Sequence, residues 1–250
     1  MRSKILVAGD SIAKGIVYDG DRNRYTHSHK GFCDLIAPYL AGPLRNSARF
    51  GQTIRHGFDR LKRDIASGKP DIVLIEFGGN DCNFDWETVA AAPDKDHIPA
   101  TPIPEYERIL DEAILYCRDH GCTPVLMSLP PLDPERFFVW VGRDEPMREN
   151  ILKWLGTVMH IYSWHEQYSA AIQQAALTHR VPYIDVRRPF LARGDFRDQI
   201  CADGMHPNEQ GHFLMARACL AYIRDNAPDL LKQEKTKTKA MSLYPSLNCL

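Results

Sequence analysis

The chain lacks the features that mark several classes of protein. No apolar run approaches the roughly 20 residues that a membrane-spanning helix needs. The first apolar run, residues 5–8, has only the length of a strand and ends at Gly9, so we read no signal peptide in it. A formal net charge of −1 over 250 residues provides no electrostatic footprint for nucleic acid or for an anionic membrane. We therefore expect a cytoplasmic protein that takes a small-molecule substrate, binds no nucleic acid and does not insert into a membrane; its oligomeric state stays open.

Cysteine pairs of the metal-binding kind are also missing. The seven cysteines are an odd number and are widely scattered, at positions 33, 82, 117, 122, 201, 219 and 249. Cys117 and Cys122 are too far apart for a Cys-x-x-Cys site, and free thiols in a reducing compartment are expected. His27 and His29 form a His-x-His pair, but no third ligand lies nearby in the sequence, so a solvated loop is favoured over a metal site.

The residues that are present predict one sizeable α/β domain. A hydrophobic content of 44% is enough for a real core. Strands are predicted for residues 5–8, 43–48, 71–77, 123–129 and 181–186. Helices are predicted for residues 12–17, 31–40, 53–67, 105–120, 146–155, 161–179 and 207–223. This alternation, without any internal repeat, predicts a parallel sheet with helices on both faces, in one three-layer α/β/α domain over residues 1–231. The tail, residues 232–250, loses its periodicity and is expected to be mobile.

Several connecting segments show no clear periodicity. Residues 18–30 form a polar loop, residues 82–104 an irregular insertion, and residues 187–202 a basic, polar connection before the last helix. A second insertion, residues 132–165, is rich in large aromatic side chains: Phe137, Phe138, Trp140, Trp154 and Trp164. These rings either line a substrate pocket or pack the helices against each other, and packing is the favoured interpretation.

Chemically useful residues collect at or just beyond the carboxyl ends of the predicted strands. They are Ser11, Gly51, Asn80 and the pair Asp203 and His206, and the carboxyl ends of parallel strands share one edge of a sheet. A serine nucleophile needs a base, an imidazole can be that base, and a carboxylate can orient the imidazole. A glycine amide and an asparagine side chain can stabilise an oxyanion. Taken alone, these residues have ordinary explanations: Ser11 and Asp203 can cap helices, and His206 can be a surface histidine.

Together these turns resemble the four sequence blocks of the SGNH/GDSL hydrolases, in the order of that family. The blocks are Gly9-Asp10-Ser11-Ile12, Gly51 after Asn46, Gly78-Gly79-Asn80-Asp81, and Asp203-Gly204-Met205-His206-Pro207. The glycine block is the loosest, since Ala48-Arg49-Phe50 precedes it where smaller residues are common. The family has a flavodoxin-like fold with a five-stranded parallel sheet, which agrees with the strand count. The Gly-x-Ser-x-Gly elbow of the α/β-hydrolases is absent, and the serine lies on the first strand.

The resemblance implies a role for each matched residue. Ser11 is the nucleophile, His206 is the general base and then the general acid, and Asp203 orients His206. The oxyanion hole comprises the backbone amide of Ser11, the amide of Gly51 and the side-chain amide of Asn80. Neither a metal nor an organic cofactor is implied.

Four residues near these blocks are alternatives to be set aside. Asp10 and Asp81 could orient the histidine, but each adjoins another motif residue and is expected to brace its turn. His212 lies six residues after His206 and is expected to face elsewhere on the last helix. Cys82 has no base paired with it in the sequence and is not expected to be a nucleophile.

The resulting hypothesis is a serine esterase that hydrolyses a carboxylic ester through an acyl-enzyme intermediate. We favour a small acyl ester, such as an acetylated sugar. The same resemblance also covers lipases, thioesterases and acyltransferases. An alternative of another class is a non-catalytic ligand-binding domain; its signature would be a missing Ser, His or Asn block, and none is missing.

Overall fold

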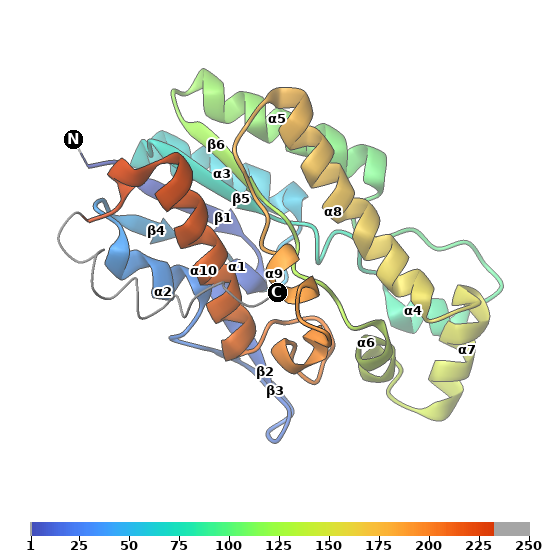
Figure 1. Ribbon diagram of the computed structural model, residues 1–250. Helices are drawn as coiled ribbons and strands as arrows, with labels where there is room; N and C mark the ends of the chain where they lie inside the picture. The colour runs from blue at the N-terminus through green and yellow to red at the C-terminus, as the bar shows by residue number, and fades with distance from the viewer. Residues whose placement is uncertain (1, 233–250) are drawn as a thin grey trace.

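The computed structural model describes residues 2–232 and has a five-stranded parallel sheet at its centre (Figure 1). Its strands follow the order β4-β1-β5-β6-β7. They are β1 (Ile5–Gly9), β4 (Leu44–Asn46), β5 (Ile72–Glu76), β6 (Thr123–Met127) and β7 (Tyr183–Ile184). In register, Val7 lies opposite Asn46 on one side and Leu74 on the other. The predicted fold class is therefore confirmed, including the weakly patterned strand β4.

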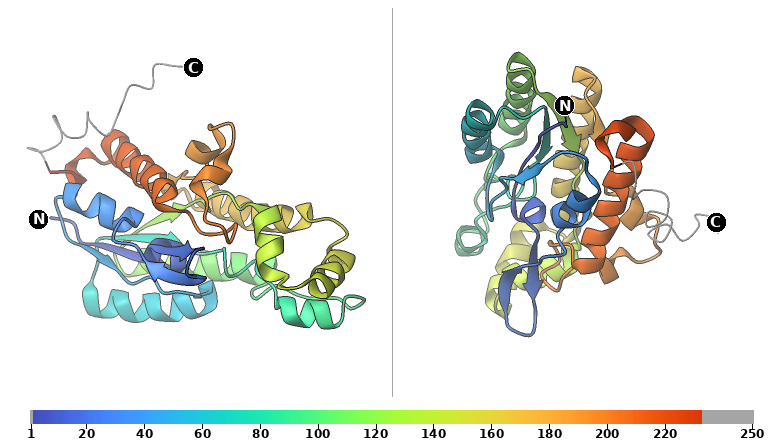
Figure 2. Two further views of the ribbon diagram at one scale, coloured as in Figure 1. Left: turned by 90° about the horizontal axis from the view of Figure 1, so that it is seen from below. Right: turned by 90° about the vertical axis from the view of Figure 1, so that its left-hand side faces the viewer.

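Helices cover both faces of the sheet (Figures 1 and 2). Successive strand residues point to opposite faces, so Leu6 and Val73 pack in one core and Val7 and Leu74 in the other. The first core also contains residues of α3 (Ile54–Gly68), α5 (Ile103–Asp119) and α8 (Met159–His179). The second contains residues of α2 (Phe32–Ile36) and α10 (Glu209–Asn226). This is a three-layer α/β/α arrangement. The tail predicted to be mobile comprises residues 232–250, and all of it after Lys232 lies outside the described residues.

A third apolar cluster groups the helices of the two insertions at one end of the molecule (Figure 2, left). It involves α4 (Trp86–Ala91), α6 (Pro134–Val141), α7 (Glu145–Leu155) and the start of α8. The predicted irregular insertion is thus wrong over α4, which the Asp85 side chain caps by accepting from Thr88 N. Helix α6 was not predicted either. Trp154 and Trp164 stack with ring centroids 5.6 Å apart, which agrees with the packing interpretation for Trp154, whereas Trp164 also lines a small cavity.

The polar loop predicted for residues 18–30 is wrong. Strands β2 (Ile16–Asp19) and β3 (Arg24–His27) pair there in an antiparallel hairpin, outside the main sheet. The helix predicted for residues 12–17 is also too long, because α1 (Ser11–Lys14) ends at Gly15, whose φ of +82° is left-handed. The chain therefore turns directly from β1 through one helical turn into the hairpin.

The remaining elements are short. The helix predicted for residues 31–40 ends at Ile36 and continues as a 3-10 turn, Ala37–Tyr39, which contains Pro38. The connection over residues 187–202 holds α9 (Arg188–Leu191) and a 3-10 turn, Phe196–Gln199; another, Pro228–Leu230, follows α10. No helix in residues 2–232 combines the length and the apolar character that a membrane span requires.

Candidate active site

Ser11 begins helix α1 at the carboxyl end of β1, and the cap of this helix is Asp10. The Asp10 carboxylate accepts from Ile12 N at 2.9 Å, and the Glu76 carboxylate accepts from Ala13 N at 3.2 Å. Within residues 2–232, the Ser11 N–H has no hydrogen-bond partner. The possibility that Ser11 is itself the cap is therefore wrong, because its neighbour takes that role. The hydroxyl of Ser11 is therefore not used as a cap, and its amide has no partner within residues 2–232.

His206 and Asp203 lie in the loop before α10 and continue a chain of hydrogen bonds from Ser11. His206 Nε2 is 2.8 Å from Ser11 Oγ, and His206 Nδ1 is 2.6 Å from Asp203 Oδ2. Asp203 Oδ1 accepts the backbone amides of Met205 and His206, both at 3.1 Å, which fixes the carboxylate. Both side chains are at most 1% exposed, and Asn208 caps α10. The alternative of a capping aspartate beside a surface histidine therefore fails.

Gly204 ties this loop to helix α6. Its φ is +75°, and a Cβ there would lie 2.4 Å from Phe137 N, so only glycine fits. Its carbonyl accepts from Asp133 N at 2.8 Å. The position of Asp203 and His206 thus depends on an insertion helix as well as on α10.

Asn80 and Gly51 are brought next to Ser11 by contacts to Ser11's own neighbours. Asn80 Nδ2 donates to Asp10 Oδ2 at 3.0 Å and, more weakly, to Gln52 O at 3.4 Å. The loop that holds Gly51 is anchored to β1 by Arg49 N, which donates to the Gly9 carbonyl at 3.1 Å. Gly51 has a φ of +69°, a conformation that favours glycine, and its N–H bonds to no other group of the described chain. The backbone amides of Ser11 and Gly51 therefore have no partner among the described residues, whereas both hydrogens of the Asn80 side-chain amide are engaged, by Asp10 and by Gln52.

Three buried carboxyl groups support this arrangement. Burial raises the pKa of Asp10 to about 6, and it raises that of Glu76 well above its ordinary value, helped by the adjacent Asp10. Burial also raises the pKa of Asp81 to about 6. Asp81 accepts from Ile54 N at 2.9 Å and so fixes the start of α3. Asp10 and Asp81 brace their turns, as expected, and within residues 2–232 neither is hydrogen-bonded to His206.

A set of aromatic residues beside His206 was missed by the sequence analysis. Tyr25, on β3, donates its hydroxyl to Asp203 Oδ2 at 3.2 Å, and its ring centroid is 5.0 Å from that of His206. Burial, and then the charge of Asp203, raises the pKa of Tyr25 well above its ordinary value, so the hydroxyl keeps its proton. The Phe50 and Trp140 rings lie 5.0 and 6.1 Å from Tyr25. The sequence signal that could have predicted the hairpin, and with it Tyr25, is the pair Tyr18 and Tyr25 on either side of a turn rich in Asp, Gly and Asn.

The other candidates have structural explanations. His212 is buried with its ring against Phe32, and burial lowers its pKa to about 4. Burial raises the pKa of Cys82 well above its ordinary value, which disfavours a thiolate. The rings of His27 and His29 are 5.4 Å apart, and residues 2–232 contain no cluster of three or more His, Cys, Asp or Glu side chains that could hold a metal ion.

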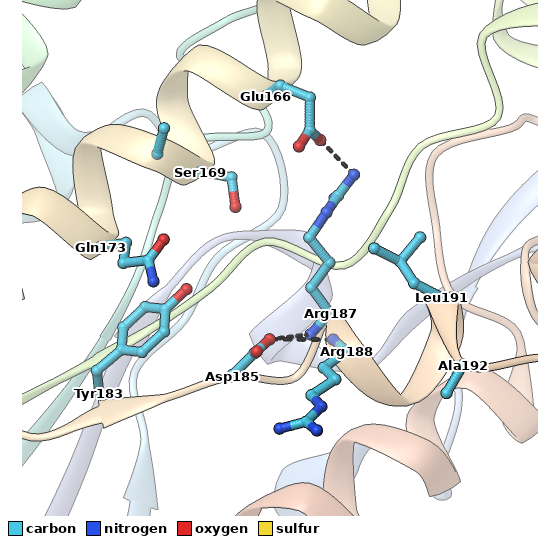
Figure 3. Close-up of a pocket in the computed structure, with 10 residues that line it drawn as sticks. Glu166, Ser169, Gln173, Tyr183, Asp185, Arg187, Arg188, Leu191 and Ala192 are labelled. Atoms are coloured by element: carbon cyan, nitrogen blue, oxygen red, sulfur yellow. Dashed lines mark hydrogen bonds and ion pairs between the residues drawn. The ribbon is translucent and has the colours of Figure 1, made fainter. Parts of the chain in front are cut away.

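Two cavities differ in their relation to this site. A small apolar cavity of about 20 Å³ is lined by Gly79 and Met205, the residues before Asn80 and His206, together with rings from the insertions. A larger, open pocket of about 450 Å³ lies at the outer strand, between α8 and α9 (Figure 3). Glu166 and Arg187 form an ion pair there, and none of the predicted site residues line it.

Comparison with known proteins identifies the family of the chain. Residues 7–214 match the model of the GDSL-like Lipase/Acylhydrolase family. The chain belongs to this family. As a GDSL hydrolase it acts on ester bonds. It is 24% identical, over 196 residues and 77% of each chain, to an acetylxylan esterase from Geobacillus stearothermophilus.

Solved structures show the same fold as this GDSL hydrolase. A lipase/acylhydrolase from Enterococcus faecalis superimposes with a TM-score of 0.64 at 22% identity, covering 93% of this chain and 98% of the other. A catalytic mutant of an acetylxylan esterase from Geobacillus stearothermophilus gives a TM-score of 0.59 at 22% identity, with 88% and 94% coverage.

Proposed function

We propose that this GDSL hydrolase is a serine esterase that uses Ser11, His206 and Asp203 to hydrolyse carboxylic esters of small acyl groups, such as acetylated sugars. The observation that carries the proposal is the continuous set of contacts from Ser11 Oγ through both nitrogens of His206 to Asp203. A serine hydroxyl is a weak nucleophile unless a base is in hydrogen-bond contact with it. A buried carboxylate on the far nitrogen selects the required tautomer and stabilises the imidazolium.

The reaction proceeds in two halves. Ser11 Oγ attacks the ester carbonyl carbon while its proton passes to His206 Nε2, and the carbonyl oxygen takes up the negative charge. The amides of Ser11 and Gly51 donate to that oxygen, and Asn80 joins them by exchanging its weaker hydrogen bond, to Gln52 O at 3.4 Å, for one to the oxyanion. His206 then protonates the departing alcohol as the acyl–oxygen bond breaks, which leaves the acyl group on Ser11. In the second half His206 activates a water, and the carboxylic acid and free Ser11 result.

The small cavity supports the preference for a short acyl group. A cavity needs about 10–15 Å³ to hold one water molecule. The space of about 20 Å³ beside Gly79 and Met205 therefore accommodates a group the size of a methyl and little more. Phe137 and Trp164, from the insertions, close it on the far side. The cavity matches the methyl of an acetyl group in size and is smaller than a longer acyl chain. The acetylxylan esterase among the relatives agrees with this preference.

Kinetics with a series of aryl esters test the proposal. We expect kcat/KM to fall from acetyl to butyryl to octanoyl esters of one phenol. Ser11→Ala should lower kcat by at least about 10³-fold, whereas Ser163→Ala, an exposed serine on α8, should leave it unchanged. A phosphonate probe should label Ser11, as mass spectrometry would show. Full activity of Ser11→Ala, or rates that rise steadily with chain length, would overturn the proposal.

Acyl transfer is tested in the same assay. A second alcohol is added, and free acid and new ester are counted separately. Hydrolysis predicts that free acid dominates in water; new ester as the main product would assign the chain to the acyltransferases instead.

A further inference from the structure

Three aromatic residues from separate segments gather on the His206 side of the candidate site. They are Tyr25 of β3, Phe50 of the loop after β4, and Trp140 of α6. Tyr25 is in ring contact with both others, and the Phe50 ring lies parallel to the His206 ring, at a centroid distance of 6.4 Å and an interplanar angle of 1°. Because His206 has to protonate the departing alcohol, that alcohol must lie beside His206 and hence beside these rings.

Phe50 is unusual in this group because 54% of it is exposed. The other two rings are half-buried. The backbone of Phe50 is held in place, since Arg49 N bonds to the end of β1 and Gln52 N donates back to the Arg49 carbonyl at 3.3 Å. A fixed, exposed aromatic face beside a reactive site is typical of a ligand-binding surface. Phe50 also departs from the family pattern, in which smaller residues precede the glycine that Gly51 matches.

From the exposure of Phe50, its fixed backbone and its place beside His206, and resting on the proposed function, we infer that Phe50 selects the alcohol part of the substrate and that this alcohol is a pyranose ring. A pyranose presents flat C–H faces, which pack on an aromatic ring. A short alkyl alcohol offers no such face. Phe50 thus determines specificity, while Ser11 and His206 carry out the chemistry.

The test compares two acetate esters that differ only in the alcohol: an acetylated methyl pyranoside and ethyl acetate. Acetate release gives kcat/KM for each, and the ratio of the two values is the selectivity. We expect Phe50→Ala to lower the selectivity about tenfold, mainly through KM of the pyranoside, in line with the strength of an aromatic contact. Phe50→Trp should restore it.

Leu177→Ala is the matched control, because Leu177 is 67% exposed on α8 and lies in none of the described site contacts; it should not change the selectivity. If ethyl acetate is hydrolysed by Ser11-dependent chemistry but Phe50→Ala leaves the selectivity unchanged, the inference is wrong and the proposed function stands. If neither ester is hydrolysed, both are wrong.

Discussion

Replacing Asp203 by Asn separates the orienting role of this side chain from its place in the fold. In the structure Oδ1 of Asp203 accepts two backbone amides at 3.1 Å, and Oδ2 faces His206 Nδ1 at 2.6 Å. An asparagine that keeps both amide bonds must turn its NH₂ toward His206 Nδ1. The imidazole then carries its proton on Nε2, facing Ser11, and cannot accept the serine proton. Turning the amide the other way loses two buried hydrogen bonds.

We therefore expect Asp203→Asn to lower kcat by about 10⁴-fold, or about 5 kcal/mol in the barrier, as for other triads with the wrong tautomer. KM and the melting temperature should change little, because size and most contacts are retained. Initial rates on an aryl acetate give kcat and KM, and differential scanning fluorimetry gives the melting temperature. Asp229→Asn, at an exposed site, is the control. A variant that kept more than about a tenth of wild-type kcat would refute the reasoning about the tautomer.

Three further outcomes follow from other parts of the site. Asn80→Ala should lower kcat about 10²-fold with a smaller effect on KM, because one oxyanion donor is lost; an unchanged kcat in the aryl acetate assay would contradict this role. Phe137→Ala should raise the butyrate-to-acetate ratio of kcat/KM about tenfold by enlarging the small cavity, and should lower the melting temperature. Asp81→Asn should be stabilising above pH 7. The folded-state pKa is raised from 3.8 to about 6, so the wild type loses up to about 3 kcal/mol of stability as the pH rises through 6. Urea unfolding at pH 4 and pH 8 should show a difference between variant and wild type only at pH 8; an equal difference at both would contradict the pKa argument.

The strands and the polar turns could be predicted because their signals are local. A run such as residues 72–75 is apolar throughout, since both faces of a central parallel strand are buried. The turns that follow β1 and β5 carry Ser11 and Asn80, and parallel topology brings these two strand ends together. His206 lies farther on, in the loop before α10, and its sequence block was found by its motif. Recognising a role for each still depended on the family resemblance, because Ser11 and Asp203 have ordinary capping explanations when taken singly.

The hairpin β2–β3 was missed because it has almost no apolar signature. The stretch from Arg24 to His27 is half or fully exposed, so its sequence is that of a polar loop. The contact between Tyr25 and Asp203 joins residues 178 positions apart, and it depends on a hairpin that the sequence did not predict. Helix α6 is a different case, because its start has a local sequence signal. Asp133 and Pro134 are typical of a helix cap and first turn, although no helix was predicted there.

Asp10 explains why the hydroxyl of Ser11 is available to His206. A serine at the end of a strand, before a helix, would ordinarily use its hydroxyl to cap the first turn. Here one oxygen of Asp10 takes the cap through Ile12 N, and the other holds the side chain of Asn80. The hydroxyl of Ser11 is left for His206, and its amide has no other partner within residues 2–232. The two oxygens of the Asp10 carboxylate therefore accept one hydrogen bond each, one from the first turn of the helix and one from Asn80. A serine at position 10 has a single oxygen for both bonds.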